Sequence, residues 1–282
     1  MRFYLICTFL LGTFILTFSN DTSRVADSLF EAESFFDAAV EYERLFYFSN
    51  DYRDKNRFRF KKALCFKSMG DYSASKNELV KINLIGLNPD EKRLITYETA
   101  LISFVERDYE FCAKTLMRIE YDIYEQEQRK NLFLIATLNY AMMEDFENSE
   151  KFALKFASLN SKPDQLPIIS NQIKQAYLKK NRPRIKSEKV FDWIGIIPGF
   201  GQFYVGKFGE GITNIALNVT AFSFGVFQII NGFYFTGYFV GTLSINKFYF
   251  GGRTRAKNLF KEVNAYQLTN YQNKLREILV AE

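Results

Sequence analysis

The chain of 282 residues contains no histidine, and it has only three cysteines and one tryptophan. Without histidine, neither a Ser-His-Asp nor a Cys-His nucleophile can form, and no metal site can use an imidazole ligand. No two cysteines are spaced as C-x-x-C, which excludes a zinc finger, and three are too few for a disulfide-rich scaffold. These absences predict a protein without a metal or another cofactor.

The formal net charge is +5, a mild basic excess that is not typical of nucleic-acid binding. Hydrophobic residues make up 48% of the chain and aromatic residues 17%, far more than a disordered, solvated chain carries. The length suits one large or two modest domains with a real core. We therefore expect a folded protein that binds no nucleic acid.

The N-terminus has the pattern of a targeting segment. Met1 and Arg2 are followed by an uncharged, apolar run from Phe3 to Phe18 and then by polar residues. One basic residue before such a run is typical of a secretory signal. Because the small-x-small cleavage pattern is poor, residues 1–20 are predicted to be a signal peptide or an uncleaved N-terminal anchor. A buried first helix of a soluble domain is the alternative.

Four similar stretches follow one another at intervals of 37 residues. Each contains a short polar turn, an aromatic residue and, three residues later, a small residue. The aromatic positions are Phe35, Tyr72, Tyr109 and Phe146, the small positions are Ala38, Ser75, Cys112 and Ser149, and Gly70 occupies the second turn. Seven residues before the last three turns stand Ala63, Ala100 and Thr137. The pattern predicts pairs of helices that are joined by a tight turn and cross at small residues.

This pattern resembles the tetratricopeptide repeat, most clearly over residues 70–75, Gly-Asp-Tyr-Ser-Ala-Ser. The interval of 37 residues exceeds the family's period of about 34, which implies longer helices or inter-repeat loops. The resemblance covers three full units and one partial unit within residues 21–178. It implies an all-α solenoid whose curved surface binds proteins. An irregular helical bundle with coincidental spacing is the alternative.

No charged residue occurs between Gly211 and Asn246, and Asn231-Gly232 divides this stretch in two. A membrane-spanning helix needs about 20 residues, so segments 211–230 and 233–250 predict a helical membrane hairpin. In the second segment, Gly237 and Gly241 form a G-x-x-x-G pair that lets helices approach closely. Short β-strands are the alternative, but the stretch is too short for a transmembrane barrel.

A glycine-rich motif precedes these spans over residues 197–207, Ile-Pro-Gly-Phe-Gly-Gln-Phe-Tyr-Val-Gly-Lys. It resembles the Pro-Gly-x-Gly-Gln-x-Tyr-x-Gly signature of bacterial two-transmembrane-helix domains. The matching residues are Pro198, Gly199, Gly201, Gln202, Tyr204 and Gly206. The resemblance covers residues 190–252 and implies an architecture, not an activity. We expect the aromatic residues and Gln202 at the membrane interface, and the sequence leaves open whether segment 190–206 also enters the membrane as a re-entrant or third segment.

The sequence predicts no catalytic residue. Segment Gly201–Phe208 comes within one residue of a phosphate-binding P-loop, but Phe208 stands where that motif needs serine or threonine. Cys65 and Cys112 fall in predicted repeat helices, where buried packing explains them better than catalysis. We therefore expect a protein that is not an enzyme. Basic residues of the second repeat are candidate contacts for an acidic partner, although a solvated helix face explains them equally well: Arg57, Arg59, Lys61 and Lys62.

A basic linker over residues 179–189 precedes the membrane domain, and an amphipathic helix is predicted over residues 253–282. Together these features predict an integral membrane protein of the bacterial cell envelope, with periplasmic repeats that bind other proteins as a non-enzymatic scaffold. The inner membrane is favoured, and the sequence leaves the outer membrane open. Membrane lipid is the second expected partner. The alternative is a small transporter or assembly factor whose hairpin forms homo-oligomers and whose repeats recruit or gate. That function would use polar residues inside the membrane, for which Asn214, Asn218 and Gln228 are the candidates.

Overall fold

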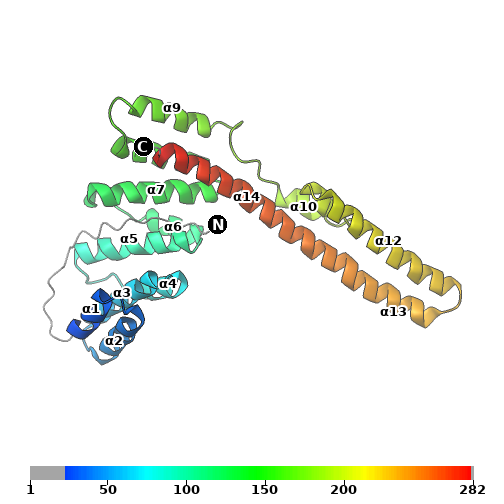
Figure 1. The fold of residues 1–282 in the computed structure, drawn as a ribbon, viewed down its shortest axis with the longest axis horizontal. Coiled ribbons are helices and arrows are strands. Elements are labelled where there is room, and N and C mark those ends of the chain that lie inside the picture. Colours follow the sequence, from blue (N-terminus) through cyan, green and yellow to red (C-terminus); the bar gives the residue numbers. More distant parts are fainter. Residues whose placement is uncertain (1–22, 281–282) are drawn as a thin grey trace. The chain divides into compact units, whose positions relative to one another are not determined.

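The computed structural model describes residues 23–280, and these residues form helices without any β-strand (Figure 1). The predicted all-α class is confirmed for this part of the chain. The predicted signal or anchor over residues 1–20 lies outside the described residues. The chain divides after Ile119 into two compact units, which we call unit 1 and unit 2 and describe separately.

Unit 1 contains three pairs of helices, and each pair packs as a helix, a tight turn and a second helix. The helices are α1 (Arg24–Glu31), α2 (Phe35–Phe48), α3 (Tyr52–Ser68), α4 (Tyr72–Val80), α5 (Pro89–Val105) and α6 (Tyr109–Leu116). The capping box of Asn88 and Glu91, with Pro89 in the first turn, fixes the start of α5.

Unit 2 begins with one further pair and ends with a long hairpin. Its elements are the 3₁₀ turn η2 (Tyr121–Ile123), α7 (Gln126–Met142), α8 (Phe146–Asn160), α9 (Leu166–Ala176), α10 (Glu188–Ile194), α11 (Phe200–Tyr204), α12 (Phe208–Ile230), α13 (Tyr234–Ser244), the π-helix η3 (Ile245–Phe250) and α14 (Gly251–Val280). The linker between α9 and α10 has no helix.

The same turn closes all four helix pairs. The residue at the turn adopts a left-handed backbone conformation in each, with φ between 59° and 80°, at Glu33, Gly70, Arg107 and Glu144. The next N–H donates to the carbonyl five residues back, for example from Asp71 to Phe66 at 2.9 Å. This is the Schellman arrangement that ends many helices. The interval of 37 residues in the sequence therefore corresponds to a repeated backbone conformation.

Aspartate starts the second helix of three pairs, because its carboxylate accepts a hydrogen bond from the first helical turn. Asp71 accepts from the N–H of Ala74, and Asp108 and Asp145 accept in the same way from Phe111 and Asn148. An acceptor at this position satisfies one of the four unpaired N–H groups of a helix start. Ser34, at the equivalent position of the first pair, makes no such bond.

The small residues predicted at the helix crossings are fully buried, and three of them donate a hydrogen bond across the crossing. Ser75 Oγ donates to the carbonyl of Ala63 at 2.8 Å, and Ser149 Oγ donates to that of Thr137 at 2.7 Å. Cys112 Sγ contacts the carbonyl of Ala100 at 3.4 Å in the same position. The predicted aromatic residues are less uniform, since Tyr72 is 37% exposed whereas the other three are half-buried.

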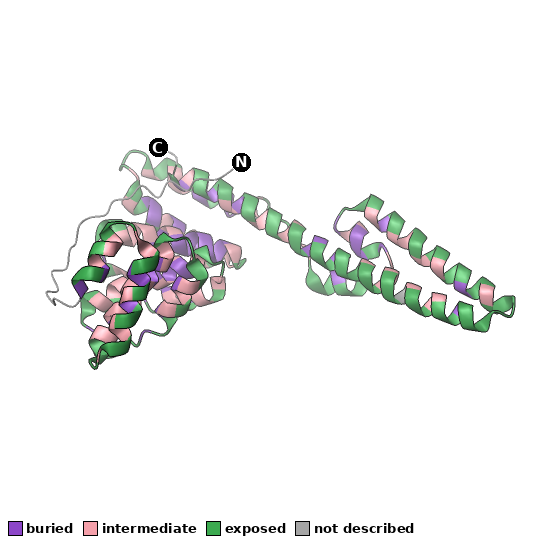
Figure 2. Cartoon of the chain, turned by 60° about the horizontal axis from the view of Figure 1, so that its bottom comes forward, coloured by how far each residue is buried: buried purple, intermediate pink, exposed green. Residues whose placement is uncertain are grey.

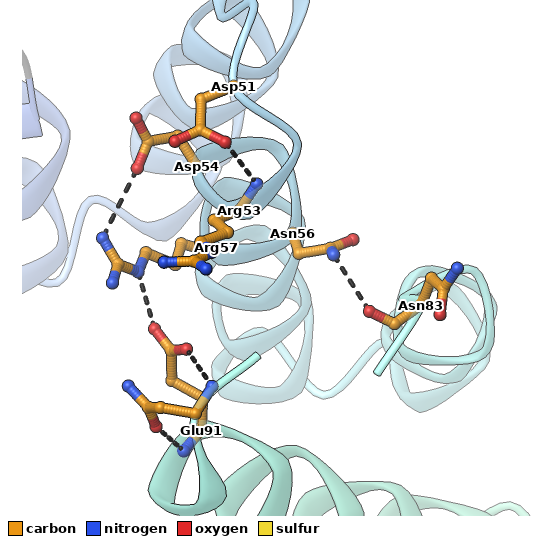
Figure 3. A network of polar contacts seen from close by, with 8 residues as sticks. Asp51, Arg53, Asp54, Asn56, Arg57, Asn83 and Glu91 are labelled. Atoms are coloured by element: carbon orange, nitrogen blue, oxygen red, sulfur yellow. Dashed lines mark hydrogen bonds and ion pairs between the residues drawn. The ribbon is translucent and has the colours of Figure 1, made fainter. Parts of the chain in front are cut away.

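Charged side chains of α3 hold unit 1 together, as Figure 3 shows for one part of the network. Arg57 pairs with Glu91 of α5 at 2.7 Å, while the buried Asn56 donates to the carbonyl of Asn83 at 3.0 Å. Further along α3, basic residues reach the helices on either side: Arg59 pairs with Glu78, Lys61 with Asp27, and Lys62 with Glu43 and Glu78. All four basic residues that were candidates for an acidic partner are thus engaged inside unit 1.

The hairpin of unit 2 consists of α12 packed against α13, joined by a short turn at Asn231-Gly232 (Figure 1). The helical backbone then runs without a break from α13 through η3 into α14. The second span and the C-terminal helix, which we predict as separate elements, form one helical segment from Tyr234 to Val280.

Two clusters of buried residues connect α14 to the rest of unit 2. Near its start, Leu259 and Phe260 pack with Phe191 of α10, and the Phe191 and Phe260 rings stack at 4.7 Å. Near its end, α14 lies against α7 and α9, and Tyr271 Oη donates to the carbonyl of Ala176 at 3.2 Å. One helix therefore connects the base of the hairpin to the helix pair of α7 and α8.

The repeated left-handed turn leads to a prediction on stability. A non-glycine residue in this left-handed conformation costs about 1–2 kcal/mol. Glycine avoids this cost but has a larger conformational entropy in the unfolded chain, so its net advantage is about 0.5–1 kcal/mol. Arg107→Gly should therefore stabilise unit 1, and Gly70→Ala should destabilise it, each by about 0.5–1 kcal/mol. Urea unfolding of the detergent-solubilised chain, followed by circular dichroism, measures both changes. A stabilising Gly70→Ala would contradict the assignment of the turn.

Candidate functional site

At the base of the hairpin, α11, α12 and the start of α14 meet and are joined by side-chain hydrogen bonds. Gly199 precedes α11 with φ of 84°, and a Cβ at this position would lie 2.5 Å from the carbonyl oxygen of Gly211. A Cβ on Gly211 would in turn lie 2.8 Å from the carbonyl oxygen of Gly199. Two glycines are therefore needed for this turn to contact the first part of α12. Pro198 lies directly before it, and Gly206, with φ of 82°, ends α11.

Gln202 is buried within the base of the hairpin, and its expected position at the membrane interface stays a prediction. Its side chain is 3% exposed, and its Nε2 donates to the carbonyl of Gly252 in α14 at 2.9 Å. Gly201 beside it packs so closely that a Cβ would lie 3.0 Å from Cβ of Ala256. The Gly-Gln pair of the motif therefore attaches α11 to α14.

Two tyrosines and an asparagine complete the attachment of the linker. Tyr204 Oη accepts a hydrogen bond from the N–H of Ser187 at 3.1 Å, and Tyr249 Oη donates to the carbonyl of Ile196 at 2.9 Å. The side-chain amide of Asn264 bonds both backbone groups of Lys186, at 2.9 and 3.0 Å. Asn264 thus holds the last part of the basic linker against α14 and Tyr204 holds it against α11, while Tyr249 holds the segment that follows α10.

Two asparagines of α12 form a short chain of hydrogen bonds that reaches the π-helical segment η3. Asn214 Nδ2 donates to the carbonyl of Phe248 in η3 at 3.1 Å, and Asn218 Nδ2 donates to the carbonyl of Asn214 at 2.8 Å. A Cβ on Gly252 would collide with the Asn214 amide, so a side chain there would displace this amide from its bond to Phe248. π-Helical segments are frequent at functional sites and where a side chain contacts the helical ladder.

The two glycines of the G-x-x-x-G pair face different surroundings. A Cβ on Gly237 would lie 2.6 Å from Cγ1 of Ile229 and 2.9 Å from the carbonyl oxygen of Gly225. A Cβ on Gly241 would meet nothing within 4 Å, although its Cα lies 3.3 Å from the Cβ position of Gly225. Gly237 thus packs against α12 through Gly225 and Ile229, whereas at Gly241 only the backbone lies near Gly225 and the side-chain position is open.

A shallow groove of about 430 Å³ opens beside this base and is almost entirely apolar. It is lined by Pro198, Asn218, Val219, Ala221, Phe222, Ser244 and Tyr249. Phe222, which lines one side of the groove, is 66% exposed. The groove is therefore suited to an apolar chain rather than to a polar metabolite.

Helix α12 exposes most of its apolar side chains, as the predominance of green over the hairpin shows in Figure 2. It has 23 residues and is, among residues 23–280, the one helix long and apolar enough to cross a membrane. Helix α13 has only 11 residues and reaches a comparable length together with η3. By length and composition alone, unit 2 thus contains one candidate membrane-spanning helix.

The remaining reactive groups of the described residues are packed into the helix pairs. Burial raises the pKa of the Cys65 thiol to about 11 and that of the Cys112 thiol to about 12, so both are protonated at neutral pH. Within residues 23–280, no three cysteine, aspartate or glutamate side chains gather as metal ligands. The two cysteines are therefore packing residues.

Comparisons of the chain with protein-family models, with curated proteins and with solved structures find no match. The two resemblances drawn from the sequence therefore rest on its own motifs. Sequence reasoning found Gln202 and Gly199 as motif residues, but it did not find their partners Gly252 and Gly211. Neither partner carries a side chain whose chemistry would have indicated the contact.

The different surroundings of the two paired glycines can be tested. Gly237→Ala should destabilise the hairpin by about 1–3 kcal/mol, because the added methyl group forces α12 and α13 apart. Gly241→Ala is the matched control on the same helix and should cost nothing, since alanine favours a helix over glycine. Thermal unfolding in detergent measures both. An equal loss of thermal stability in the two variants would show that both glycines pack equally tightly, which would contradict the geometry of Gly237 and Gly241.

Proposed function

We propose that the chain is a non-enzymatic, membrane-anchored scaffold of the bacterial cell envelope, in which tetratricopeptide-like repeats bind other proteins and the hairpin holds them at the inner membrane. The observation that carries the anchoring is the apolar surface of α12. Phe222, Phe227 and Ile230 are each more than 60% exposed, and no charge occurs over residues 211–246. Such a continuous surface is unfavourable in water and is satisfied by lipid.

Two membrane segments, not three, fit the hairpin best. Helices α10 and α11 have seven and five residues, which gives each a length of roughly 10 Å or less at the helical rise. The hydrocarbon core is about 30 Å thick, so neither helix can cross it. Segment 190–206 is then a packed cover at the base of the hairpin.

Two segments place the linker and α14 on one side of the membrane. The end of α14 packs against α7 and α9, so the α7–α8 pair belongs to that side as well. The first apolar segment of a chain usually dominates its orientation, and here Arg2 precedes it. We therefore propose that the repeats and α14 are periplasmic, although the basic linker opposes this by the positive-inside tendency.

An exposed apolar stripe on α2 is the best candidate surface for a protein partner. Phe36, Val40 and Tyr47 lie on one face of the helix and are 69%, 51% and 78% exposed. The basic residues of α3, in contrast, are already paired within unit 1. This favours an apolar partner segment over an acidic one.

The alternative function, a conduit formed by oligomerising hairpins, receives less support. It needs polar groups and small residues that are free to face another chain. Asn214 and Asn218 donate within their own hairpin, and Gly237 packs against Gly225 of the same chain. Gln228 is the one remaining candidate of the three, and alone it cannot line a polar path.

Site-specific photo-crosslinking in cells tests the scaffold function. A photoreactive residue at Phe36 or Tyr47 should crosslink to a discrete protein, and the product should remain with membranes after alkaline carbonate extraction. The matched control is Ile85, which is 78% exposed in the loop after α4. Phe36→Ser combined with Tyr47→Ser should abolish crosslinking from Val40. Carbonate-extractable protein, or equal products from all positions, would contradict the proposal.

A further inference from the structure

Charge is distributed very unevenly along unit 2. Residues 179–262 contain twelve lysine and arginine residues but only four acidic ones, a net charge of +8 against +5 for the whole chain. None of these charges lies in residues 211–246, which form the outer part of the hairpin. The base of the hairpin therefore carries essentially all of the charge.

The fold places basic residues of three segments at the base of the hairpin. Arg255 of α14 forms a two-bond ion pair with Glu210 of α12, at 2.9 and 3.0 Å, which fixes the starts of these two helices side by side. The bonds between Lys186 and Asn264 fix the linker against α14. We call the exposed basic residues gathered here the basic collar: Lys189, Lys207, Arg253, Lys257 and Lys261.

The positive charge of the collar is not neutralised by ion pairs among the described residues, so it is available to an anionic ligand. Within residues 23–280, none of its five side chains has an ion-pair partner, and Glu210 and Glu262 both contact Arg255 instead. Unpaired basic groups of this density normally repel one another and favour a bound anion.

If the hairpin crosses the membrane, the collar residues lie at the level of the lipid headgroups. Lys207 directly precedes α12, and Arg253 follows the end of η3 by three residues. From Arg253 to Lys261 the helix rises about 12 Å, and the headgroup layer is about 5–8 Å deep. The nearer residues would lie within that layer and the farther ones within about one Debye length of it.

The apolar groove lies at the depth where an acyl chain would follow. Tyr249 lines the groove, and Arg253 lies one turn of helix farther toward the base. A lipid whose phosphate contacts the collar can therefore place a chain along the groove.

We propose that the basic collar and the groove bind anionic phospholipid and thereby fix the depth and orientation of the hairpin in the membrane. This inference rests on the proposed function, because it requires the hairpin to be inserted. Lys and Arg residues near an anionic surface attract its lipids and lose that attraction as salt increases.

The only tryptophan of the chain provides the probe. Trp193 is 79% exposed on α10, four residues after Lys189 and on the same helix face. The full chain is reconstituted into phosphatidylcholine vesicles that contain equal mole fractions of either brominated phosphatidylglycerol or brominated phosphatidylcholine. Bromine quenches nearby tryptophan, so the ratio of quenching reports which lipid surrounds the collar.

We expect the anionic lipid to be enriched around Trp193 about fivefold, and the enrichment to fall in high salt. Replacing the five collar residues by glutamine should reduce the ratio to about one while quenching by brominated phosphatidylcholine persists, which shows that the variant still inserts. A control variant with five exposed lysines elsewhere replaced by glutamine should keep the enrichment: Lys92, Lys151, Lys162, Lys174 and Lys274.

Four results would overturn the inference. Equal quenching by both lipids in the wild-type chain, or enrichment that survives in the collar variant, would exclude a role of the collar. Loss of the enrichment in inorganic phosphate, but not in chloride of the same ionic strength, would assign the collar to free phosphate. Absence of quenching by either lipid, together with release by alkaline carbonate, would instead contradict membrane insertion and thus the proposed function itself.

Discussion

The arrangement of unit 2 depends on two side-chain amides that bind the backbone of one helix. Asn214 donates to the carbonyl of Phe248, and Gln202 donates to that of Gly252, four residues farther along. A buried amide without a partner costs several kcal/mol in an apolar environment, so these bonds strongly favour one register between α12, α11 and α14. Gly252 makes both contacts feasible, because it leaves room for Asn214 and exposes its own carbonyl to Gln202.

This attachment has a mechanical consequence. Because α13, η3 and α14 form one uninterrupted helical segment, the hairpin and the cluster around Tyr271 belong to the same helix. A displacement of the hairpin base would be transmitted to the contact of α14 with α7 and α9. Within unit 2, the hairpin is thus connected to the α7–α8 pair by helix and not by a flexible linker.

Local features of the fold could be predicted from the sequence, and long-range contacts could not. The four turns were predictable because Gly70, Asp71 and the small residue Ser75 each satisfy a requirement of neighbouring backbone, and the same requirements return every 37 residues. The burial of Gln202 was not, since its partner lies 50 residues away and is a glycine. The ion pair between Arg57 and Glu91 was not predicted either. In a sequence, a charged residue that forms an ion pair between helices cannot be distinguished from one that is exposed to solvent. The π-helix η3 was not predicted either, and its contact with α12 through Asn214 is again a long-range one.

The proposed function requires the hairpin to cross the membrane twice, with both of its ends on one side. One cysteine at a time in place of Lys180, Asn231 or Lys274, in a chain with Cys7→Ser whose buried Cys65 and Cys112 are kept, tests this directly. These three residues are exposed and lie in the linker, at the hairpin tip and near the end of α14. A membrane-impermeant maleimide added to spheroplasts should label the first and third, and it should label the tip only after the membrane is opened. Labelling of all three from one side, or of Lys180 and Lys274 from opposite sides, would contradict the account.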